Sequence, residues 1–292
     1  MLRIAFALYR QWGYNIFENI LAYQKIRKDF LIDTLIASPD HQFRIKDDIK
    51  KQIKTYIVSP YSTKKLHTIL SKNKINIVFW YSWSWIVGKP LLENFISLCL
   101  HPSMLPQYRG GTPIQHQIIN GEKKSGVTIF KMSRNIDAGP IYKQKPMSLA
   151  GNVNDIFSRM IDIGTIMSKN IIRDAINNNL TFIPQGNFDM YPPNKRRTPK
   201  QSEIKLEVLS KTTYEALYNL VRGLLDPYPN AYIAINNHQI LIQSIEKYIT
   251  LPKSSIVISS DNKYPLETFK TNINIYLKLK DGYAKLVKFK IR

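Results

Sequence analysis

The sequence predicts an α/β protein with an open sheet in its first part and a smaller β-rich, barrel-like domain in its second. Up to about residue 176, short apolar runs alternate with helical patterns, which is typical of parallel βα units. Beyond a turn-rich, basic stretch near residue 183, one helical pattern is followed by several β-like runs. We therefore expect a first domain at residues 1–183, a linker at 184–203 and a second domain at 204–292.

The elements of the first domain follow from hydrophobic periodicity. A turn at Ser38-Pro39-Asp40 should end the second strand, and Thr112 should cap a helix that begins at Pro113. The long helix expected near the end of this domain has apolar residues at helical spacing from Ile156 to Ile171. Strands are expected at 3–8, 30–36, 56–58, 75–80, 97–100, 126–132 and 141–149, and helices at 16–23, 63–72, 113–121 and 154–176.

The second domain is expected to contain one helix and mostly strands. The helix covers about 214–224. The β-like runs are 232–235, 240–245, 256–259, 272–277 and 285–289. These short runs suit a small sheet or barrel.

Composition limits the class of protein. The 292 residues carry 42 Lys and Arg against 21 Asp and Glu, a net charge of +21. Such a field attracts anions, although a composition bias toward Lys, Ile and Asn would also raise the charge. Cys99 is the single cysteine, so an intramolecular disulfide and a cysteine-based zinc site are excluded. No apolar stretch reaches the ~20 residues of a membrane span, and we expect a soluble, cytoplasmic protein.

His101 is the histidine whose position favours catalysis. It follows an expected strand and enters a loop rich in Pro and Gly, at the strand end where open α/β sheets bind ligands. Imidazole titrates near neutrality and can move a proton. Asp137, in a turn before Gly139, could orient it, provided that strand 126–132 lies beside strand 97–100. An ordinary Asx turn is the alternative for Asp137.

Two further patterns bear on the site. Tyr81, Trp83 and Trp85 follow the strand at 75–80 and could line an apolar slot for a flat ring. Such aromatic residues more often only pack in the core or lie on the surface. A nucleophilic Ser103 is conceivable, but no Gly-x-Ser-x-Gly elbow surrounds it. Phosphate-loop and dinucleotide fingerprints are absent from the sequence.

One long motif runs through the loop after His101 and the Asp137 turn. It reads His101-Pro102-Ser103-x-Leu105-Pro106-x-Tyr108-Arg109-Gly110-Gly111-x-Pro113-Ile114-Gln115, then Ile119-Asn120-Gly121, Gly126-Val127-Thr128 and Asp137-Ala138-Gly139. This motif resembles the signature of the 10-formyltetrahydrofolate-dependent formyltransferases, a family that includes methionyl-tRNA, glycinamide ribonucleotide and sugar N-formyltransferases. The similarity extends weakly from the first strand to about residue 245, and residues 246–292 resemble nothing that we can name.

The resemblance implies a Rossmann-like formyltransferase domain, 10-formyltetrahydrofolate as co-substrate and no metal. The family's catalytic Asn, His and Asp fall on Cys99, His101 and Asp137. The Cys departs from the family pattern, because the Asn would donate a hydrogen bond to the oxyanion, and losing such a donor costs about 100-fold or more in rate. Another donor, a subfamily trait or an impaired enzyme would each explain it, and we favour the subfamily trait. A covalent Cys99 nucleophile is the less favoured alternative.

The resemblance also assigns binding residues. Direct attack of the amine on the formyl carbon is implied, with His101 and Asp137 moving the proton. Co-substrate contacts are expected from Tyr81, Trp83, Trp85, Ile86, Ile136, Asp137 and Gly139. Contacts to the amine substrate are expected from Ser103, Tyr108, Arg109, Gly110, Gly111, Gln115, Asn219 and Arg222.

Three features favour a nucleotide-linked amino sugar of surface polysaccharide synthesis as the acceptor. Residues 218–222 and 226–231 resemble the Asn-Leu-x-Arg and Asp-Pro-Tyr-Pro segments of the sugar enzymes, and 196–199 resembles their Arg-Arg-Thr-Pro linker. Residues 39–54 contain no glycine, unlike the basic loop of the tRNA enzymes. The charge of +21 would suit tRNA, which is the alternative. A non-catalytic folate-binding homologue is a third hypothesis, motivated by Cys99, and a homodimer is one option for the assembly.

Overall fold

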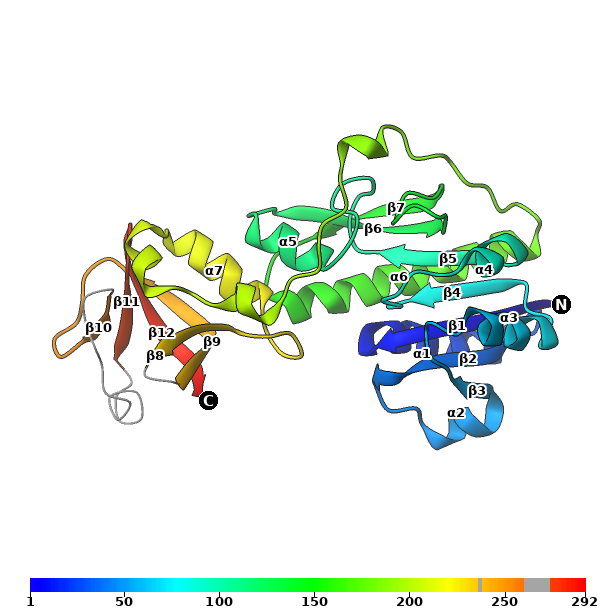
Figure 1. Cartoon of the computed structure of the whole chain (residues 1–292), viewed down its shortest axis with the longest axis horizontal. Helices are drawn as coiled ribbons and strands as arrows, with labels where there is room; N and C mark the ends of the chain where they lie inside the picture. Colours follow the sequence, from blue (N-terminus) through cyan, green and yellow to red (C-terminus); the bar gives the residue numbers. More distant parts are fainter. Residues whose placement is uncertain (236–237, 260–273) are drawn as a thin grey trace. The chain divides into compact units, whose positions relative to one another are not determined.

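The computed structural model describes residues 1–235, 238–259 and 274–292. It forms two compact units, and the chain alternates between them (Figure 1). The domain boundaries predicted at 183 and 204 stay a prediction, because the units are not continuous along the sequence. The first unit comprises Met1–Gly110, Ser125–Ser148 and Phe157–Asn194, and the second comprises Gly111–Lys124, Leu149–Ile156 and Lys195–Arg292.

A seven-stranded sheet forms the centre of the first unit, in the order β3-β2-β1-β4-β5-β6-β7. The pairs from β3 to β5 are parallel, as the sequence predicts, whereas β5 and β6 are antiparallel. The α/β class with an open sheet is therefore confirmed. The strands are β1 (Leu2–Arg10), β2 (Phe30–Gln42), β3 (Lys54–Ile57), β4 (Ile77–Tyr81), β5 (Ile96–His101), β6 (Lys124–Lys131) and β7 (Ile141–Ser148).

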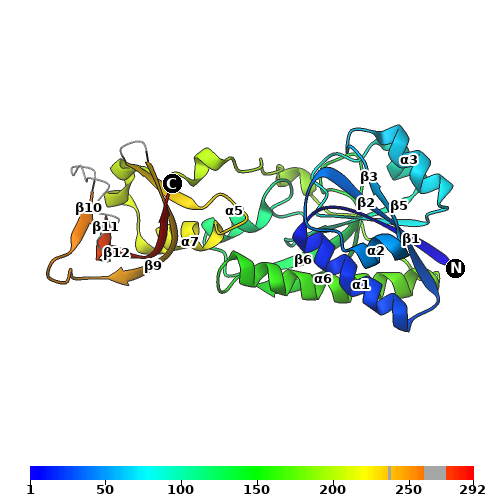
Figure 2. The same cartoon turned by 90° about the horizontal axis from the view of Figure 1, so that it is seen from below.

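Helices cover both faces of this sheet, since successive side chains of its central strands point to opposite sides. Phe79 and Tyr81 lie on the face with α1 (Gln11–Ile26) and α6 (Val153–Ile176), which run side by side in Figure 2. Val78 and Trp80 pack on the other face with α3 (Thr63–Lys72) and α4 (Lys89–Asn94). Strands buried on both faces explain the continuous apolar runs in the sequence.

One expectation about local structure was wrong, and another was correct in position only. The second strand does not end at Ser38-Pro39-Asp40 but continues to Gln42, because Gln42 pairs with Arg10 after a register shift. Thr112 is the N-cap residue of the helix that begins at Pro113, as predicted, but its side chain makes no capping hydrogen bond. Its backbone is left-handed, with φ +46°, and its hydroxyl accepts a hydrogen bond from the Arg197 amide.

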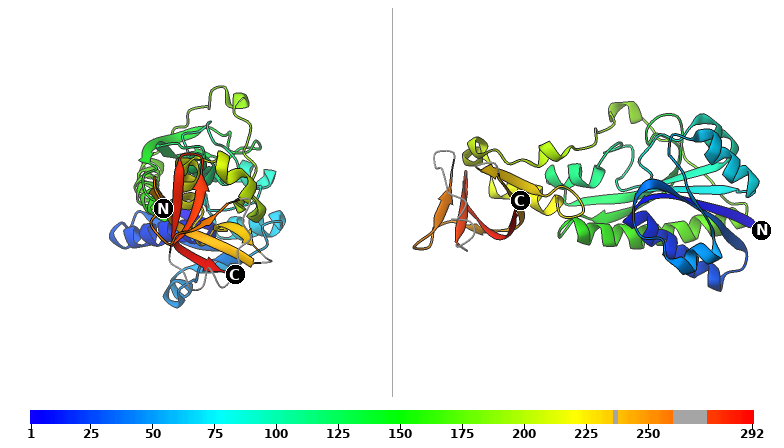
Figure 3. Two further views of the ribbon diagram at one scale, coloured as in Figure 1. Left: turned by 90° about the vertical axis from the view of Figure 1, so that its left-hand side faces the viewer. Right: turned by 60° about the horizontal axis from the view of Figure 1, so that its bottom comes forward.

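The second unit has a five-stranded sheet in the order β10-β11-β12-β9-β8, which curls around its own core (Figure 3). The predicted β-rich part is confirmed, and the run expected from Asn272 begins outside the described residues. Helix α5 packs on α7, where Gly223 lies against Ile118. The elements are α5 (Pro113–Ile119), α7 (Tyr214–Gly223), β8 (Ala231–Ile235), β9 (His238–Tyr248), β10 (Ile256–Ile258), β11 (Ile275–Leu279) and β12 (Gly282–Ile291).

Short helical segments complete the chain. Residues 47–52 form α2 (Asp47–Gln52), and 3₁₀ turns occur at Phe188–Met190, Pro199–Ser202 and Leu206–Lys211. Within the described ranges, none of the helices is both long and apolar enough to cross a membrane.

Candidate active site

The end of β5 brings the predicted catalytic residues together. Strand β5 pairs with β6 so that Cys99 lies opposite Phe130 and His101 lies opposite Thr128. The condition for an Asp137–His101 pair, that these two strands lie side by side, is therefore met. The turn after β6 then returns toward β5, and Asp137 Oδ2 lies 3.3 Å from His101 Nδ1.

The loop after His101 is held by its own polar groups. Ser103 is fully buried, and its hydroxyl donates to the carbonyl oxygen of Gln107 at 2.6 Å. The Ser103 carbonyl oxygen accepts from the Thr128 hydroxyl at 2.7 Å. Because both of these polar groups of Ser103 are engaged inside the loop, the residue shapes the site and is not placed as a nucleophile.

The imidazole of His101 lies between two oxygen atoms. Nε2 lies 2.9 Å from the carbonyl oxygen of Tyr108, which can only accept, so Nε2 carries a proton and donates it. Nδ1 faces the Asp137 carboxylate. In the neutral ring the lone pair is therefore on Nδ1. The His101 ring is buried, with 5% exposure, so Nδ1 is screened from bulk water.

Asp137 holds an uncommon backbone conformation that aims its carboxylate at the histidine. Its φ is +49°, in the left-handed region. The Gly110 amide donates to Oδ2 at 2.9 Å, so this oxygen contacts the imidazole and a backbone N–H together. Gly110 is needed for this approach, because its φ is +96° and an added Cβ would lie 2.5 Å from the Asn194 carbonyl oxygen.

Arg109 is buried and bonded to the backbone, although the sequence predicts a substrate contact there. Its Nη1 donates to the Ile136 carbonyl oxygen at 3.1 Å, and its Nε donates to the Tyr191 carbonyl oxygen. The guanidinium also lies 5.2 Å from the centre of the Phe188 ring. Arg109 thus joins the loop after β5, the Asp137 turn and the 188–191 segment.

The sequence analysis missed Gln185, which it placed in the linker. Its Nε2 donates to the carbonyl oxygens of Asp137 and Gly139, at 2.9 and 2.8 Å. Gly139 packs so closely on β6 that an added Cβ would lie 1.8 Å from the Lys131 carbonyl oxygen. A glutamine in a turn-rich stretch gives no local signal of such a role, because its partners lie almost fifty positions away.

Cys99 lies within the same region as a half-buried thiol. Loss of water around the thiol raises its pKa well above the usual value, and the negative charge of Asp137 raises it further. The residue is therefore a neutral thiol at neutral pH, with its sulfur 3.7 Å from the Leu100 carbonyl oxygen. A neutral thiol is a poor nucleophile, which argues against covalent catalysis.

The residues expected to contact the co-substrate divide into buried and exposed groups. The Tyr81 ring is fully buried and its hydroxyl lies 2.9 Å from the Ser168 hydroxyl, so its side chain belongs to the core. Trp83 and Trp85 lie edge to face, 5.2 Å between ring centres. Ile86 and Ile136 are exposed, at 79% and 48%. The loop at 83–86 and the turn at 136 thus present apolar side chains to solvent.

The other predicted substrate residues lie in the second unit. The Arg222 Nη1 donates to the carbonyl oxygens of Leu149 and Gly151, at 2.7 and 2.8 Å, and its Nε donates to Asn219. Burial lowers the pKa of Arg222. Gln115 is 2% exposed, and its Nε2 has no hydrogen-bond partner among the described residues. Arg222 and Asn219 therefore serve first to hold the 149–151 loop, while Gln115 keeps an unused donor.

Comparison with known proteins identifies a domain. The sequence pattern described as formyl transferase matches residues 41–155. The methionyl-tRNA formyltransferase of Lactobacillus acidophilus is 31% identical over 156 residues, which are 52% of this chain and 48% of that protein. That of Mesoplasma florum is 26% identical over 255 residues, or 85% of this chain and 78% of that protein. Residues 41–155 of this chain are therefore a formyl transferase domain.

The chain spans about half the length of the first of these relatives. Solved structures share the fold at low identity. A sugar N-formyltransferase from Shewanella sp. has a TM-score of 0.67 at 18% identity, covering 84% of this chain and 97% of that one. A methionyl-tRNA formyltransferase from Clostridium thermocellum has a TM-score of 0.62 at 22% identity, covering 85% and 94%. HypX from Aquifex aeolicus in complex with tetrahydrofolic acid has a TM-score of 0.65 at 14% identity, covering 100% and 44%.

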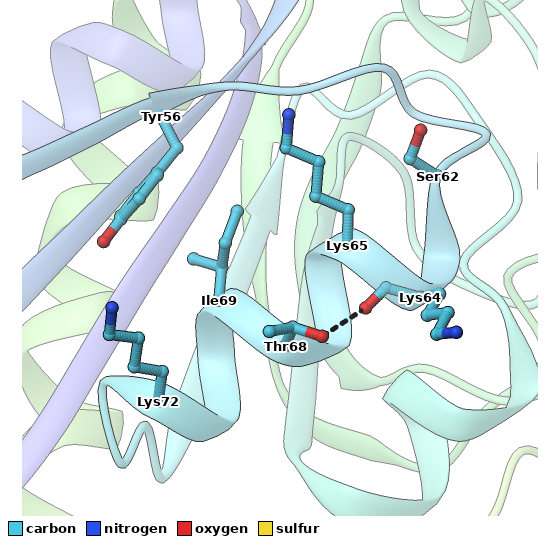
Figure 4. Close-up of a pocket in the computed structure, with 7 residues that line it drawn as sticks. All are labelled: Tyr56, Ser62, Lys64, Lys65, Thr68, Ile69 and Lys72. Atoms are coloured by element: carbon cyan, nitrogen blue, oxygen red, sulfur yellow. Dashed lines mark hydrogen bonds between the residues drawn. The ribbon is translucent and has the colours of Figure 1, made fainter.

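The first unit also has a basic pocket elsewhere (Figure 4). It lies between the edge strand β3 and helix α3, and Tyr56 and Ile69 line it. Lys64, Lys65 and Lys72 line it together with Ser62 and Thr68. The lining of this pocket contains no His, Asp, Glu or Cys, so it offers no carboxylate or imidazole as a base for an amine.

Proposed function

We propose that this chain transfers a formyl group from 10-formyltetrahydrofolate to a primary amine. The observation that carries the proposal is the pair of buried His101 and partly buried Asp137, whose Nδ1 and Oδ2 lie 3.3 Å apart within the formyltransferase motif. A proton acceptor of this kind is what an amine needs, because an ammonium group has no lone pair with which to attack.

The residues near the pair fit a flat co-substrate ring. Trp83 and Met132, which precedes the Asp137 turn, pack against one hydrophobic cluster, so the aromatic loop and the turn border the same apolar region. Ile136 is exposed beside Asp137. Gln185 Oε1 is buried and has no partner among the described residues. These features combine apolar walls with few polar groups, as ligand sites for ring systems usually do.

The residues of this chain would transfer protons and hold the catalytic side chains in position. The bound co-substrate supplies the formyl carbon that the amine attacks. His101 takes the proton of the attacking amine at Nδ1, where the Asp137 carboxylate stabilises the imidazolium that forms, and the proton then passes to the nitrogen of the departing tetrahydrofolate. The Tyr108 carbonyl oxygen and the Gly110 amide fix the ring and the carboxylate in place. The low exposure of His101 keeps competing water away from the transfer.

Cys99 would serve as a weak donor at the position where the family has Asn. We expect Cys99→Asn to raise kcat by about 10-fold or more, because an amide is a stronger oxyanion donor than a thiol. Cys99→Ala should lower kcat only a few-fold. Steady-state kinetics on both variants check this. Complete loss of activity in Cys99→Ala would instead identify a covalent nucleophile.

We propose a nucleotide-linked amino sugar as the acceptor. The segments at 218–222 and 226–231 carry the sugar-enzyme pattern, and the fold aligns with a sugar N-formyltransferase over 97% of that protein. The stretch 39–54 has no glycine and is occupied by the end of β2 and by helix α2. A flexible basic loop for tRNA is thus not supported at this position.

Methionyl-tRNA is the second candidate acceptor, and two observations favour it. The curated relatives reported above are methionyl-tRNA formyltransferases. The net charge of +21 would also suit a polyanion, since phosphate contacts dominate affinity for nucleic acids.

An acceptor assay separates these functions. Purified protein with 10-formyltetrahydrofolate should formylate amino sugars linked to a nucleoside diphosphate and leave charged initiator tRNA unmodified. Formylation of the tRNA alone would overturn the sugar proposal and leave formyl transfer in place. Folate binding without turnover of any amine would overturn formyl transfer itself and support a binding protein.

A further inference from the structure

Gln185 makes an unusual pair of contacts at the turn that carries Asp137. Its single amide nitrogen donates to two carbonyl oxygens, one on Asp137 and one on Gly139, at 2.9 and 2.8 Å. The side chain is 9% exposed, so water competes little for these bonds. The segment that carries Gln185 is itself fixed, because Ile183 and Ile141 exchange two backbone hydrogen bonds of 2.7 and 2.8 Å.

The turn needs such support because its conformation is unfavourable alone. Asp137 has φ +49°, and a non-glycine residue in the left-handed region costs about 1 kcal/mol or more. The carbonyl oxygen of Ile136 is bound by Arg109, and those of Asp137 and Gly139 are bound by Gln185. Arg109 also belongs to the loop of His101, whereas Gln185 comes from a segment outside that loop.

We propose that Gln185 is a positioning residue that keeps the Asp137 carboxylate against His101. This inference rests on the proposed function. Gln185 fixes the backbone carbonyl oxygens of Asp137 and Gly139. The Asp137 side chain then points at the Gly110 amide and at His101. Without both donors the turn relaxes toward ordinary φ values, and Oδ2 leaves the 3.3 Å contact with Nδ1. Misplacement of about 1 Å at a reacting centre costs on the order of 100-fold in rate.

Gln185→Met keeps the length of the side chain and removes both donors. We expect kcat to fall about 10- to 100-fold, while KM changes less. Losses of this size are typical when a residue that orients a site residue by hydrogen bonds is removed. The matched control is Gln24→Leu. Gln24 accepts a hydrogen bond from the Ile32 amide within the same unit, between α1 and β2. That variant loses a side-chain hydrogen bond of similar kind outside the site and should keep the wild-type kcat.

A second variant gives a readout that a purely structural role would not produce. In Gln185→Glu the carboxylate faces two carbonyl oxygens with no proton to donate, and it regains one donor when it is protonated. The ratio of variant to wild-type kcat should therefore rise as pH falls. A ratio independent of pH would overturn the proposal even if the Met variant fails to fold.

The last measurement does not depend on formyl transfer. Nitrogen-15 NMR of the His101 ring, assigned with His101→Asn, reports the surroundings of Nδ1 beside Asp137. We expect the same Nδ1 signal in the wild type and in Gln24→Leu, and a shifted signal in Gln185→Met. Retention of the wild-type signal and of kcat in Gln185→Met would overturn the positioning role. An inactive wild type that shows the same NMR difference would contradict the proposed function alone.

Discussion

Replacing Asp137 by asparagine is expected to lower kcat by about 100- to 10,000-fold, the usual contribution of a positioned acid–base group. The physical reason is the 3.3 Å contact between His101 Nδ1 and the Asp137 carboxylate. A carboxylate attracts the charged imidazolium that forms when the ring takes a proton from the amine. A neutral amide offers no such attraction, so the ring becomes a weaker base during the transfer.

Asparagine is the variant that isolates this effect. It tolerates the left-handed backbone at 137 better than other residues do. Its carbonyl oxygen can still accept the hydrogen bond from the Gly110 amide. The turn should therefore keep its shape, and KM for the co-substrate should stay within a few-fold of the wild type.

Steady-state kinetics with a matched control test this prediction. Asp174→Asn removes a carboxylate from the same unit, where Asp174 accepts a hydrogen bond from the Tyr142 hydroxyl at 2.6 Å. The control should retain most of the wild-type kcat, although it loses an ion pair with Lys143. If Asp137→Asn retained kcat within 10-fold, stabilisation of the His101 imidazolium by Asp137 would be wrong.

Periodicity predicted the sheet well because buried parallel strands leave continuous apolar runs. It did not predict that strand 126–132 lies beside strand 97–100, which was the condition for an Asp137–His101 pair and which the β5–β6 pairing fulfils. The extension of β2 through Pro39 to Gln42 was not predictable in this way. It depends on a pairing with Arg10 across a register shift, and sequence-local turn signals cannot anticipate it.

Side-chain roles in the candidate site were harder to predict than its backbone. A motif places a residue near a site but does not show whether its side chain contacts the substrate or the protein's own backbone. Arg109 donates to the Ile136 and Tyr191 carbonyl oxygens, and Arg222 donates to those of Leu149 and Gly151. Both guanidinium groups therefore hold loops in place. Gln185 was missed because its partners are backbone oxygens, which leave no mark in the sequence.

Gly139→Ala is the second change with a large expected effect. An added Cβ would lie 1.8 Å from the Lys131 carbonyl oxygen and 3.2 Å from the Ser133 nitrogen. Both neighbours are backbone atoms, so a side-chain rotation cannot relieve the overlap. The Lys131 amide also donates to the Pro140 carbonyl oxygen at 2.9 Å, which holds the two ends of the turn together. Overpacking of this kind costs about 1–3 kcal/mol of the free energy of unfolding.

Activity should fall more than stability in this variant, because the backbone that must move carries Asp137. A shift of about 1 Å in the carboxylate is enough for a loss on the order of 100-fold in kcat. Gly186→Ala is the matched control: it lies in the same unit, its Cβ would meet nothing within 4 Å, and an added methyl should be neutral or slightly stabilising. Urea unfolding and kcat on both variants provide the test. If Gly139→Ala and Gly186→Ala had the same kcat and the same free energy of unfolding, the turn would accommodate the added methyl group without a loss of stability. The close packing of Gly139 would then not position Asp137.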